Sequence, residues 1–582
     1  MSTALEAASL VMVPSGYEDG SLASVKPTDG SGDFTFTRGS NISATRVNEQ
    51  GYIEKGYDNL LLQSNSFLTT WSQFNANPPV SGYEGYDGTN DAWLISKTGA
   101  NGRIQQLISK SGVNAFSVYA KRADSDYILL QLVGGVSPNA KFNLITGEEI
   151  SSFGEISVFS ESIGNGWFRF TIIGGNALSL VRIYPTEETN NDATSGSIYI
   201  QDAMLNQGLV AYPYVETTTA PVAGGILEDM PRLDYTDSSC PALLLEPQRT
   251  NLLRNSEALN ISPNVVESVS YSYNEIASPS GFINAPKFSE TPDATSYRHG
   301  FYHYVSIPNG AITASIFTKQ IDRRYVSLQS NATGSNQYSY VDLEDGSVVS
   351  EGTGWTLSTE DYGNGWWRII ATATGIQGSP YFIWGMSLNG TSNTYSGDGS
   401  EFTFWGGQIE AGSYPTSYIP TYGTSQTRLN DYFKVINQEG LFGTNEGTFF
   451  VEFAFDINNK YIAIGDTYPS DKITIGLNAS GSSQIRSIIR NNGSSINLQG
   501  SGTTLGDTIK ACVSYGSSGF KLFMNGSLED SDATAANLSQ FSDLIPNVDL
   551  RDVNSSNSGT IKQILLFPTA LSDDECIELT TI

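Results

Sequence analysis

One distinctive string occurs twice in this chain, as GNGWFRF at residues 164–170 and as GNGWWRI at residues 363–369. The glycines and the asparagine supply the positive φ angles of a tight turn, and the alternating bulky residues after them are typical of a strand. A turn-and-strand signature that is repeated in this way predicts two copies of one domain.

The repeat extends to both sides of this string. NLLLQSNSF, from Asn59, matches NLLRNSEAL, from Asn251, and further along Gly208 matches Gly412. The offset between matching residues grows from 192 to 204 along the chain, as happens when homologous elements are joined by loops of different length. We therefore expect two copies of one β-sandwich of the jelly-roll type, over residues 58–218 and 250–428.

The whole chain has the composition of a β protein. At 582 residues it is too long for one core, and short aromatic and β-branched runs alternate with Gly, Asn, Asp and Ser clusters throughout. From about residue 430 onward a different series of antiparallel strands ends in a short helix after Ser572. The prediction is an all-β, multidomain fold with two duplicated sandwiches and a further C-terminal sandwich.

Charge and cysteine content exclude several classes of function. There are 31 basic and 60 acidic residues, for a net charge of −29, so a nucleic-acid backbone would be repelled. No apolar run reaches the length of a membrane span, and we predict neither nucleic-acid binding nor membrane insertion. Cys240, Cys512 and Cys576 form no disulfide or zinc pattern, and we expect the last two to be buried.

No catalytic constellation is visible in the sequence. The two histidines, His299 and His303, lie among alternating aromatic residues that favour a strand, and no HExxH or nearby acid cluster completes a metal site. Two candidate bases without a G-x-S-x-G elbow exclude a Ser-His-Asp hydrolase. We predict no catalytic residue. A hydrolase that uses paired carboxylates stays open as an alternative, because an acidic chain offers many pairs.

Aromatic residues in loops supply the candidates for ligand binding. Lectin-like sandwiches stack exposed rings on sugars and orient hydroxyls with polar groups. The candidates for stacking are Trp71, Tyr83, Tyr86, Trp93 and Trp355. The alternative for each is an ordinary core or loop residue. Trp167 and Trp366, within the repeated string, are instead expected to pack in the core of each sandwich.

One loop-like stretch, SGYEGYDGTND at residues 81–91, also carries three acids. Carboxylate oxygens at such short spacing are the ligands that calcium prefers. Glu84, Asp87 and Asp91 are therefore candidate ligands of a calcium ion, the only cofactor that the sequence suggests.

Two strings resemble a family of tailed-bacteriophage virion proteins, namely PRLDYTDSSCPALLLEPQRTNLLRNSE (231–257) and WGGQIEAGSYPTSYIPTYGTSQTR (405–428). These are minor structural, fibre or spike proteins with carbohydrate-binding-module-like jelly rolls. SGDFTFTRGSNISATRVNEQGYIE (31–54) looks like the leading segment of the same family, in which it runs almost directly into the PRLDY connector. Copy one therefore looks like an insertion after Glu54 that resumes near Ile226.

The C-terminal strings GFKLFMNGSL and IKQILLFPTALSDDE resemble a laminin-G or concanavalin-like jelly roll. The resemblance implies five parts: an N-terminal attachment or oligomerisation segment (1–57), copy one (58–218), a connector (219–249), copy two (250–428) and a laminin-G or concanavalin-like jelly roll (429–582).

The resemblance also implies a function. We expect a non-enzymatic fibre or decoration protein on the exterior of a phage particle, where many weak contacts to bacterial surface polysaccharide add up to avidity. Its expected partners are further copies of itself, most simply as a trimer, and other virion proteins. The alternatives are a spike enzyme that degrades surface polysaccharide and an inert spacer.

Overall fold

A computed structural model gives the fold. It describes residues 6–40, 42–175, 177–189, 193–261, 264–292, 297–376, 378–436, 441, 443–458, 460–465, 471–478, 483–538, 543–548 and 558–581. The chain divides into two compact units. Unit 1 comprises Met1–Glu54, Ile226–Arg249 and Thr427–Ile582, and unit 2 comprises Lys55–Gly225 and Thr250–Gln426.

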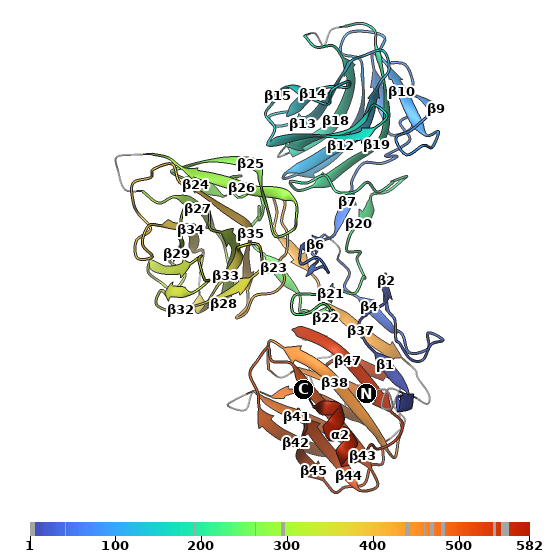
Figure 1. Ribbon diagram of the computed structural model, residues 1–582, viewed down its shortest axis with the longest axis vertical. Coiled ribbons are helices and arrows are strands. Elements are labelled where there is room, and N and C mark those ends of the chain that lie inside the picture. Colours follow the sequence, from blue (N-terminus) through green and yellow to red (C-terminus); the bar gives the residue numbers. More distant parts are fainter. Residues whose placement is uncertain are drawn as a thin grey trace. The chain divides into compact units, whose positions relative to one another are not determined.

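Unit 2 contains both copies of the repeat. Copy one leaves unit 1 after Glu54 and returns at Ile226, the two residues between which the sequence places the insertion. Copy one and copy two are drawn in blue to green and in green to yellow in Figure 1.

Copy one is a sandwich of two six-stranded antiparallel sheets. The front sheet has the order β16 (Ser157–Gly164), β17 (Trp167–Gly174), β12 (Asn114–Arg122), β19 (Ser197–Gln207), β10 (Ala92–Ser96), β9 (Val80–Tyr83). The back sheet has the order β15 (Glu149–Phe153), β14 (Asn139–Asn143), β13 (Tyr127–Gly134), β18 (Ala177–Thr186), β11 (Arg103–Ser111), β8 (Ser72–Phe74).

Copy two repeats this topology strand for strand. Its front sheet has the order β32 (Trp355–Asp361), β33 (Trp366–Ile376), β28 (Gly310–Lys319), β35 (Glu401–Ala411), β26 (Ile283–Glu290), β25 (Val269–Ala277). Its back sheet has the order β31 (Val348–Ser350), β30 (Gln337–Asp342), β29 (Tyr325–Ser330), β34 (Tyr381–Ser387), β27 (Gly300–Tyr304), β24 (Val265–Glu267). The predicted duplication of the sandwich is confirmed.

Alternation along the strands explains the two layers. On β12 the side chains of Phe116, Val118 and Ala120 are buried in the core between the sheets. Successive side chains of a strand point to opposite faces, so Ser117 and Tyr119 lie on the outer face of the front sheet. The residues on that outer face form the candidate site below.

One buried asparagine closes each sandwich. The Nδ2 of Asn59 donates to the carbonyl of Val215 at 2.8 Å, and the Nδ2 of Asn251 donates to that of Ile419, also at 2.8 Å. Each Oδ1 accepts two further backbone N–H groups. The first strand of each copy is thus fixed to the segment that follows its last strand.

In each copy an arginine on the front sheet also donates a hydrogen bond to a backbone carbonyl of the segment that follows the last strand. Arg169 on β17 donates to the carbonyl of Tyr212, and Arg368 on β33 donates to that of Thr416. These partners are matching residues of the repeat, so the duplication extends to individual hydrogen bonds.

Unit 1 is also a β-sandwich. Its first sheet has the order β21 (Leu233–Asp234), β22 (Ala242–Leu245), β47 (Gly559–Phe567), β38 (Gly447–Phe455), β43 (Ile509–Gly516), β44 (Gly519–Met524), β45 (Ser527–Asp532), with β1 (Leu10–Met12) also on β47. Its second sheet has the order β2 (Tyr17–Glu18), β3 (Ser21–Leu22), β4 (Phe34–Thr37), β37 (Tyr432–Ile436), β46 (Asp543–Val548), β39 (Lys460–Gly465), β40 (Lys472–Asn478), β41 (Gln484–Asn491), β42 (Ser494–Gly502).

Short two-stranded ladders complete the fold: β5 (Thr45–Val47) with β6 (Ile53–Lys55), β7 (Tyr57–Asn59) with β20 (Val222–Gly224), and β23 (Arg249–Asn251) with β36 (Gln426–Arg428). Helix α2 (Asp573–Thr580) begins after Ser572, whose hydroxyl accepts the N–H of Glu575 in a capping box.

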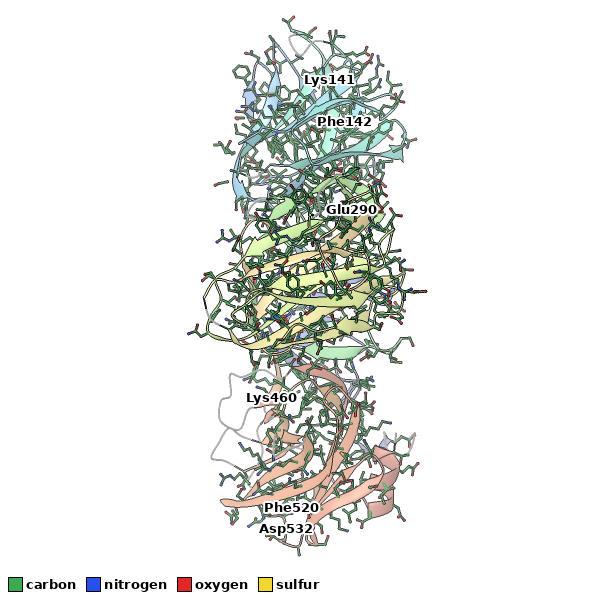
Figure 2. All side chains as sticks on the ribbon, turned by 90° about the vertical axis from the view of Figure 1, so that its left-hand side faces the viewer. Lys141, Phe142, Glu290, Lys460, Phe520 and Asp532 are labelled. Atoms are coloured by element: carbon green, nitrogen blue, oxygen red, sulfur yellow. The ribbon has the colours of Figure 1, made fainter. Side chains whose placement is uncertain are left out.

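The N-terminal segment is part of the C-terminal sandwich. Leu10, Leu22 and Phe34 are fully buried in the same core as residues of the last block, among them Phe520. Figure 2 labels Phe520 and Asp532, which face each other across β44 and β45. The described strands between Leu10 and Thr37 therefore find their core within this chain, and the role of residues 1–57 in attachment or oligomerisation stays a prediction.

Buried ion pairs join the three segments of unit 1. Arg232 of the connector donates to Glu246 at 2.7 Å and also bonds Asp431. Arg38 lies 3.3 Å from Asp431, and Arg428 lies 2.8 Å from Glu246. Leaving one member of such a group unpaired is strongly destabilising, so these charges tie the N-terminal segment and the connector to the last block.

We expect Asn59→Ala and Asn251→Ala each to lower the free energy of unfolding of unit 2 by about 3 kcal/mol, because several buried backbone groups lose their partners at once. Calorimetry or urea unfolding measures the change. Asn90→Ala is the control, since Asn90 is exposed and should change stability by less than about 0.5 kcal/mol. Closure by asparagine is contradicted if all three variants behave alike.

Candidate functional site

Three of the predicted stacking residues are core residues. Trp71, Trp93 and Trp355 are only 2%, 8% and 5% exposed, and they pack among the apolar side chains of the two sandwiches. The indole N–H groups of Trp71 and Trp93 donate to backbone carbonyls. A buried ring offers no face to a sugar from solvent, so the structure corrects the expectation for these three residues.

The tyrosines of the 81–91 stretch lie on the front sheet of copy one. Tyr86 stacks on Tyr119 with ring centroids 3.9 Å apart, and its hydroxyl donates to Asp202 at 2.8 Å. Tyr83 contacts Tyr199 with centroids 4.9 Å apart. Both predicted tyrosines are half-buried, and in this conformation their rings are engaged by other tyrosines.

The acids of the same loop are held by hydrogen-bond donors. The Nε2 of Gln201 donates to Asp91 at 2.7 Å and to Asp87 at 3.2 Å, and the hydroxyl of Thr89 bonds both. Glu84 is exposed. Within the described ranges, no group of three or more His, Cys, Asp or Glu side chains is placed to hold a metal ion. The arrangement does not support the calcium prediction.

Trp167 and Trp366 are buried, at 1% and 3% exposure, but they do not lie in the sandwich cores that the sequence predicted for them. Their neighbours Phe168 and Trp367 pack against the cores between the sheets, so the two tryptophans lie on the outer faces of the front sheets. The indole N–H of Trp366 donates to the carbonyl of Ala277. The ring of Trp167 meets that of Tyr86, and Ala277 is the last residue of β25. Strand alternation thus turns both tryptophans away from the core, which corrects the prediction.

Both histidines and two of the three cysteines are buried. Each ring nitrogen of the buried His299 faces a backbone carbonyl, at 2.9 and 3.0 Å. Cys512 and Cys576 are buried in one apolar cluster, as expected, whereas Cys240 is exposed. Burial raises the pKa of the Cys512 thiol well above its usual value, and the neighbouring Cys576 adds to this effect. Across the described part of the chain, no helix is long and apolar enough to span a membrane.

Four side chains form a row across the front sheet of copy one. Strand register places Glu161 opposite Arg169, Arg169 opposite Tyr119, and Tyr119 opposite Gln201. We call these four residues the cross-strand row. The guanidinium of Arg169 lies 5.5 Å from the ring centroid of Tyr119, a distance at which cation and ring attract each other.

Copy two has the matching row, but there it is closed. The register places Glu360 opposite Arg368, Arg368 opposite Phe317, and Phe317 opposite Trp405. The rings of Trp405 and Tyr418 lie 4.9 Å apart and are buried. Arg368 is also buried, 3.5 Å from Glu360. Aromatic rings therefore fill the place that Tyr119 and Gln201 occupy in copy one.

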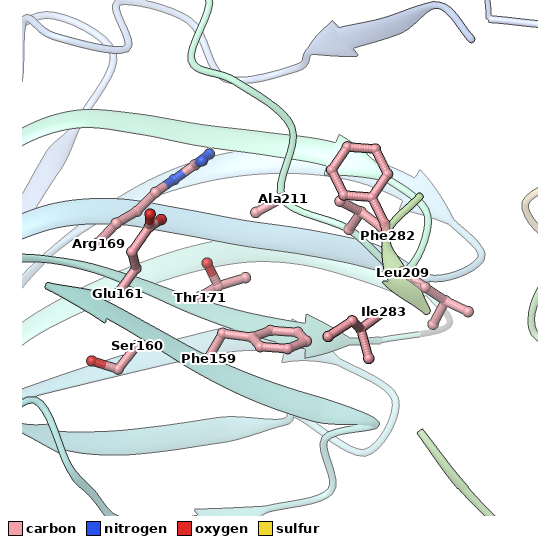
Figure 3. Close-up of a pocket in the computed structure, with 10 residues that line it drawn as sticks. Phe159, Ser160, Glu161, Arg169, Thr171, Leu209, Ala211, Phe282 and Ile283 are labelled. Atoms are coloured by element: carbon pink, nitrogen blue, oxygen red, sulfur yellow. The ribbon is translucent and has the colours of Figure 1, made fainter. Parts of the chain in front are cut away.

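Copy one has a pocket of about 240 Å³ at the charged end of its row. Arg169, Glu161 and Thr171 supply its polar groups, and the rings of Phe159 and Phe282 supply aromatic walls. Figure 3 shows Arg169 and Glu161 together at one end of the pocket and Phe282 at the other. Arg169 and Glu161 belong to copy one and Phe282 to copy two, so both sandwiches of unit 2 build this pocket.

A buried lysine fixes the wall that copy two provides. The ammonium of Lys55 donates to Glu257 and, at 2.7 Å, to the hydroxyl of Tyr422, and it lies 5.5 Å from the ring centroid of Tyr212. Phe282 meets that same Tyr212 ring edge-on at 5.5 Å. Burial alone lowers the pKa of Lys55, but the Glu257 carboxylate and the tyrosine hydroxyls raise it well above its usual value. Lys55 therefore stays charged.

Asp202 marks a second difference between the copies. It has a φ of 53° at an irregularity in the pairing of β12 with β19, where copy two has Gly406 with a φ of 61°. A left-handed conformation costs a non-glycine residue about 1–2 kcal/mol. Burial raises the pKa of Asp202 to about 6, against the hydrogen bond from Tyr86, and the nearby Asp91 and Asp87 raise it further.

Sequence reasoning missed most of this site. Arg169 lies in the string that predicts a strand, and Phe159 and Glu161 lie shortly before it, but the sequence patterns assign a binding role to none of the three. The signal that could have found them is the comparison of the two copies position by position. It aligns Tyr119 with Phe317, and Gln201 with Trp405.

Fold and site together define a multidomain β-sandwich protein with a small pocket that copy one lines with help from two residues of copy two. Neither a known protein family nor a curated protein sequence matches this chain. The solved structures similar to it include carbohydrate-binding modules and a laminin G region.

The carbohydrate-binding module CBM40 of a Ruminococcus gnavus IT-sialidase, bound to α2,3-sialyllactose, is 16% identical over 24% of this chain and 84% of its own, with a TM-score of 0.21. Domain 4 of an extracellular GH43 arabinanase from Geobacillus stearothermophilus, in complex with arabinotriose, is 16% identical over 27% and 77%, with a TM-score of 0.21. The LG1-3 region of the laminin α2 chain is 11% identical over 81% and 96%, with a TM-score of 0.19. Likeness at this level carries no argument about ligands.

The raised pKa of Asp202 gives a stability that depends on pH. The pKa of Asp202 is about 6 in the folded chain, above its ordinary value of 3.8. The contribution of Asp202 to the free energy of unfolding is therefore fully present below pH 3.8 and is lost as pH rises through 6. We expect the free energy of unfolding of the parent protein, relative to Asp202→Asn, to fall by up to about 3 kcal/mol over that range. Urea unfolding at a series of pH values measures it, and a flat difference would contradict it.

His303 should respond in the opposite direction. Burial lowers the pKa of this histidine from 6.5 to about 4, and the charge of Arg254 adds to the effect. Its contribution is present above pH 6.5 and is lost as pH falls toward 4. Relative to His303→Gln, the parent protein should lose up to about 3 kcal/mol over that range. The same urea series measures both variants, and an unchanged or rising difference would refute the burial of a neutral His303.

Proposed function

We propose that this chain is a carbohydrate-binding protein that acts through the pocket of copy one and does not catalyse a reaction. The observation that carries the proposal is the pairing, in one pocket, of aromatic walls with a cation, a carboxylate and a hydroxyl. Pockets of small ligands combine apolar walls with a few polar groups that fix orientation.

The size of the pocket suits one sugar ring. Its 240 Å³ lies below the range of about 300–1,000 Å³ for drug-sized ligands. A water molecule takes up about 30 Å³ in the liquid, so the pocket has the volume of roughly eight water molecules. Phe159 and Phe282 offer faces for the C–H groups of a pyranose, while Arg169, Glu161 and Thr171 can bond its hydroxyls.

A single small pocket supports weak binding, and many copies would be needed for firm attachment. In keeping with the sequence resemblance, we propose that the chain lies on the exterior of a phage particle, as a homo-oligomer in which a trimer is the simplest form. On this view its target is a polysaccharide of the bacterial surface. Electron microscopy of particles tests this placement by locating the protein and counting its copies.

We expect Phe282→Ala to weaken glycan binding by the full-length protein about tenfold, equivalent to about 1.4 kcal/mol, because it removes one aromatic wall. Phe153→Ala is the matched control. Phe153 is 61% exposed on β15 of the back sheet, away from the pocket, and its loss should leave affinity unchanged. Glycan arrays followed by titration calorimetry measure both variants.

Other outcomes would replace the proposal. Steady release of reducing ends from surface polysaccharide would make the protein an enzyme. The absence of any glycan binding at high valency would favour the inert spacer. Equal weakening by the two phenylalanine variants would place the binding site outside this pocket.

A further inference from the structure

We infer that the pocket of copy one selects a neutral N-acetylated sugar, whose acetamido group lies between the charged end and the apolar end. This inference rests on the proposed carbohydrate binding and names the class of sugar.

The charged end of the pocket offers one free donor and one free acceptor. Arg169 donates through Nη2 to Ser117, at 3.1 Å, and to the carbonyl of Tyr212. Its Nε is buried out of a ligand's reach, so the donor left for a ligand is the accessible Nη1, which has no partner among the described residues. The matching pair in copy two, Arg368 and Glu360, forms an ion pair at 3.5 Å. Among the described residues, Glu161 makes no such ion pair with Arg169, and both line the pocket.

A secondary amide matches this pair of groups. Guanidinium donates only and carboxylate accepts only, so the amide carbonyl can accept from Arg169 while the amide N–H donates to Glu161. A hydroxyl could also bond either group. The amide satisfies both at once and also carries a methyl group.

The opposite end of the pocket suits that methyl group. Phe282, Ile283 and Leu209 line it, and Figure 3 shows all three at the side away from Arg169. Burying a hydroxyl without a partner against such a wall costs about 1–3 kcal/mol, whereas burying a methyl group is favourable. A sugar with a hydroxyl in place of the acetamido group should therefore bind more weakly.

An acidic sugar fits less well. Glu161 is exposed at the same end as Arg169, and the chain carries a net charge of −29. A second carboxylate beside Glu161 would be repelled. The charge balance thus favours a neutral ligand.

Two neutral pairs of probes test the inference on the full-length protein: triacetylchitotriose against cellotriose, and the methyl glycosides of N-acetylgalactosamine and galactose. The two members of each pair differ in that one carries acetamido groups where the other carries hydroxyl groups. We expect at least one acetamido probe to bind about tenfold more tightly than its partner. In saturation-transfer NMR the acetamido methyl protons should receive the strongest saturation.

Two substitutions test whether the preference for acetamido sugars arises in this pocket. Glu161→Ala should reduce it at least threefold, whereas Glu149→Ala, at an exposed position on β15, should leave it unchanged. If sugars bind equally well with and without the acetamido group, or if only other glycans bind, the inference is overturned and the proposed function stands. If no glycan of any class binds, the proposed function itself is overturned.

Discussion

Each sandwich of unit 2 depends on an arginine that reaches from the front sheet to the segment following the last strand. Arg169 bonds the carbonyl of Tyr212, and Arg368 bonds that of Thr416. Arg368 is buried and Arg169 is half-buried. A guanidinium withdrawn from water needs such partners, so the segment is held across the outer face of the sheet in both copies. This segment covers part of the outer face of the front sheet and so limits which ligands that face can bind.

The two copies use this cover differently because a few side chains beneath it differ. In copy two, Trp405 and Phe317 fill the space with rings. In copy one, Gln201 and Tyr119 occupy the same positions, and the amide of Gln201 turns to the acids of the 81–91 loop. One copy thus has a face filled with rings, and the other has polar groups in the same place. The pocket lies at the Arg169 and Glu161 end of that row and is completed by Phe282 and Ile283 of copy two.

The sequence predicted those parts of the fold that depend on short, continuous stretches of residues. Turn chemistry and alternation around Trp167 and Trp366 located a strand twice, and matching strings located the two copies of the sandwich. The same local patterns could not tell on which face of a sheet a tryptophan lies. For that reason Trp71, Trp93 and Trp355 were expected at a surface although they are buried.

Features that depend on distant pairing were harder to predict. Strand β1 joins β47, more than five hundred residues away along the chain, so residues 1–57 looked like a separate segment. The pocket draws on residues near 160, 210 and 282, and no motif in the sequence links these three stretches.

The stoichiometry of sugar binding tests most directly whether one copy is open and the other closed. Titration calorimetry of the full-length protein with a glycan that binds should give one site per chain, and Arg169→Gln should abolish it. Two equivalent sites per chain, or one site that survives this substitution, would contradict the account.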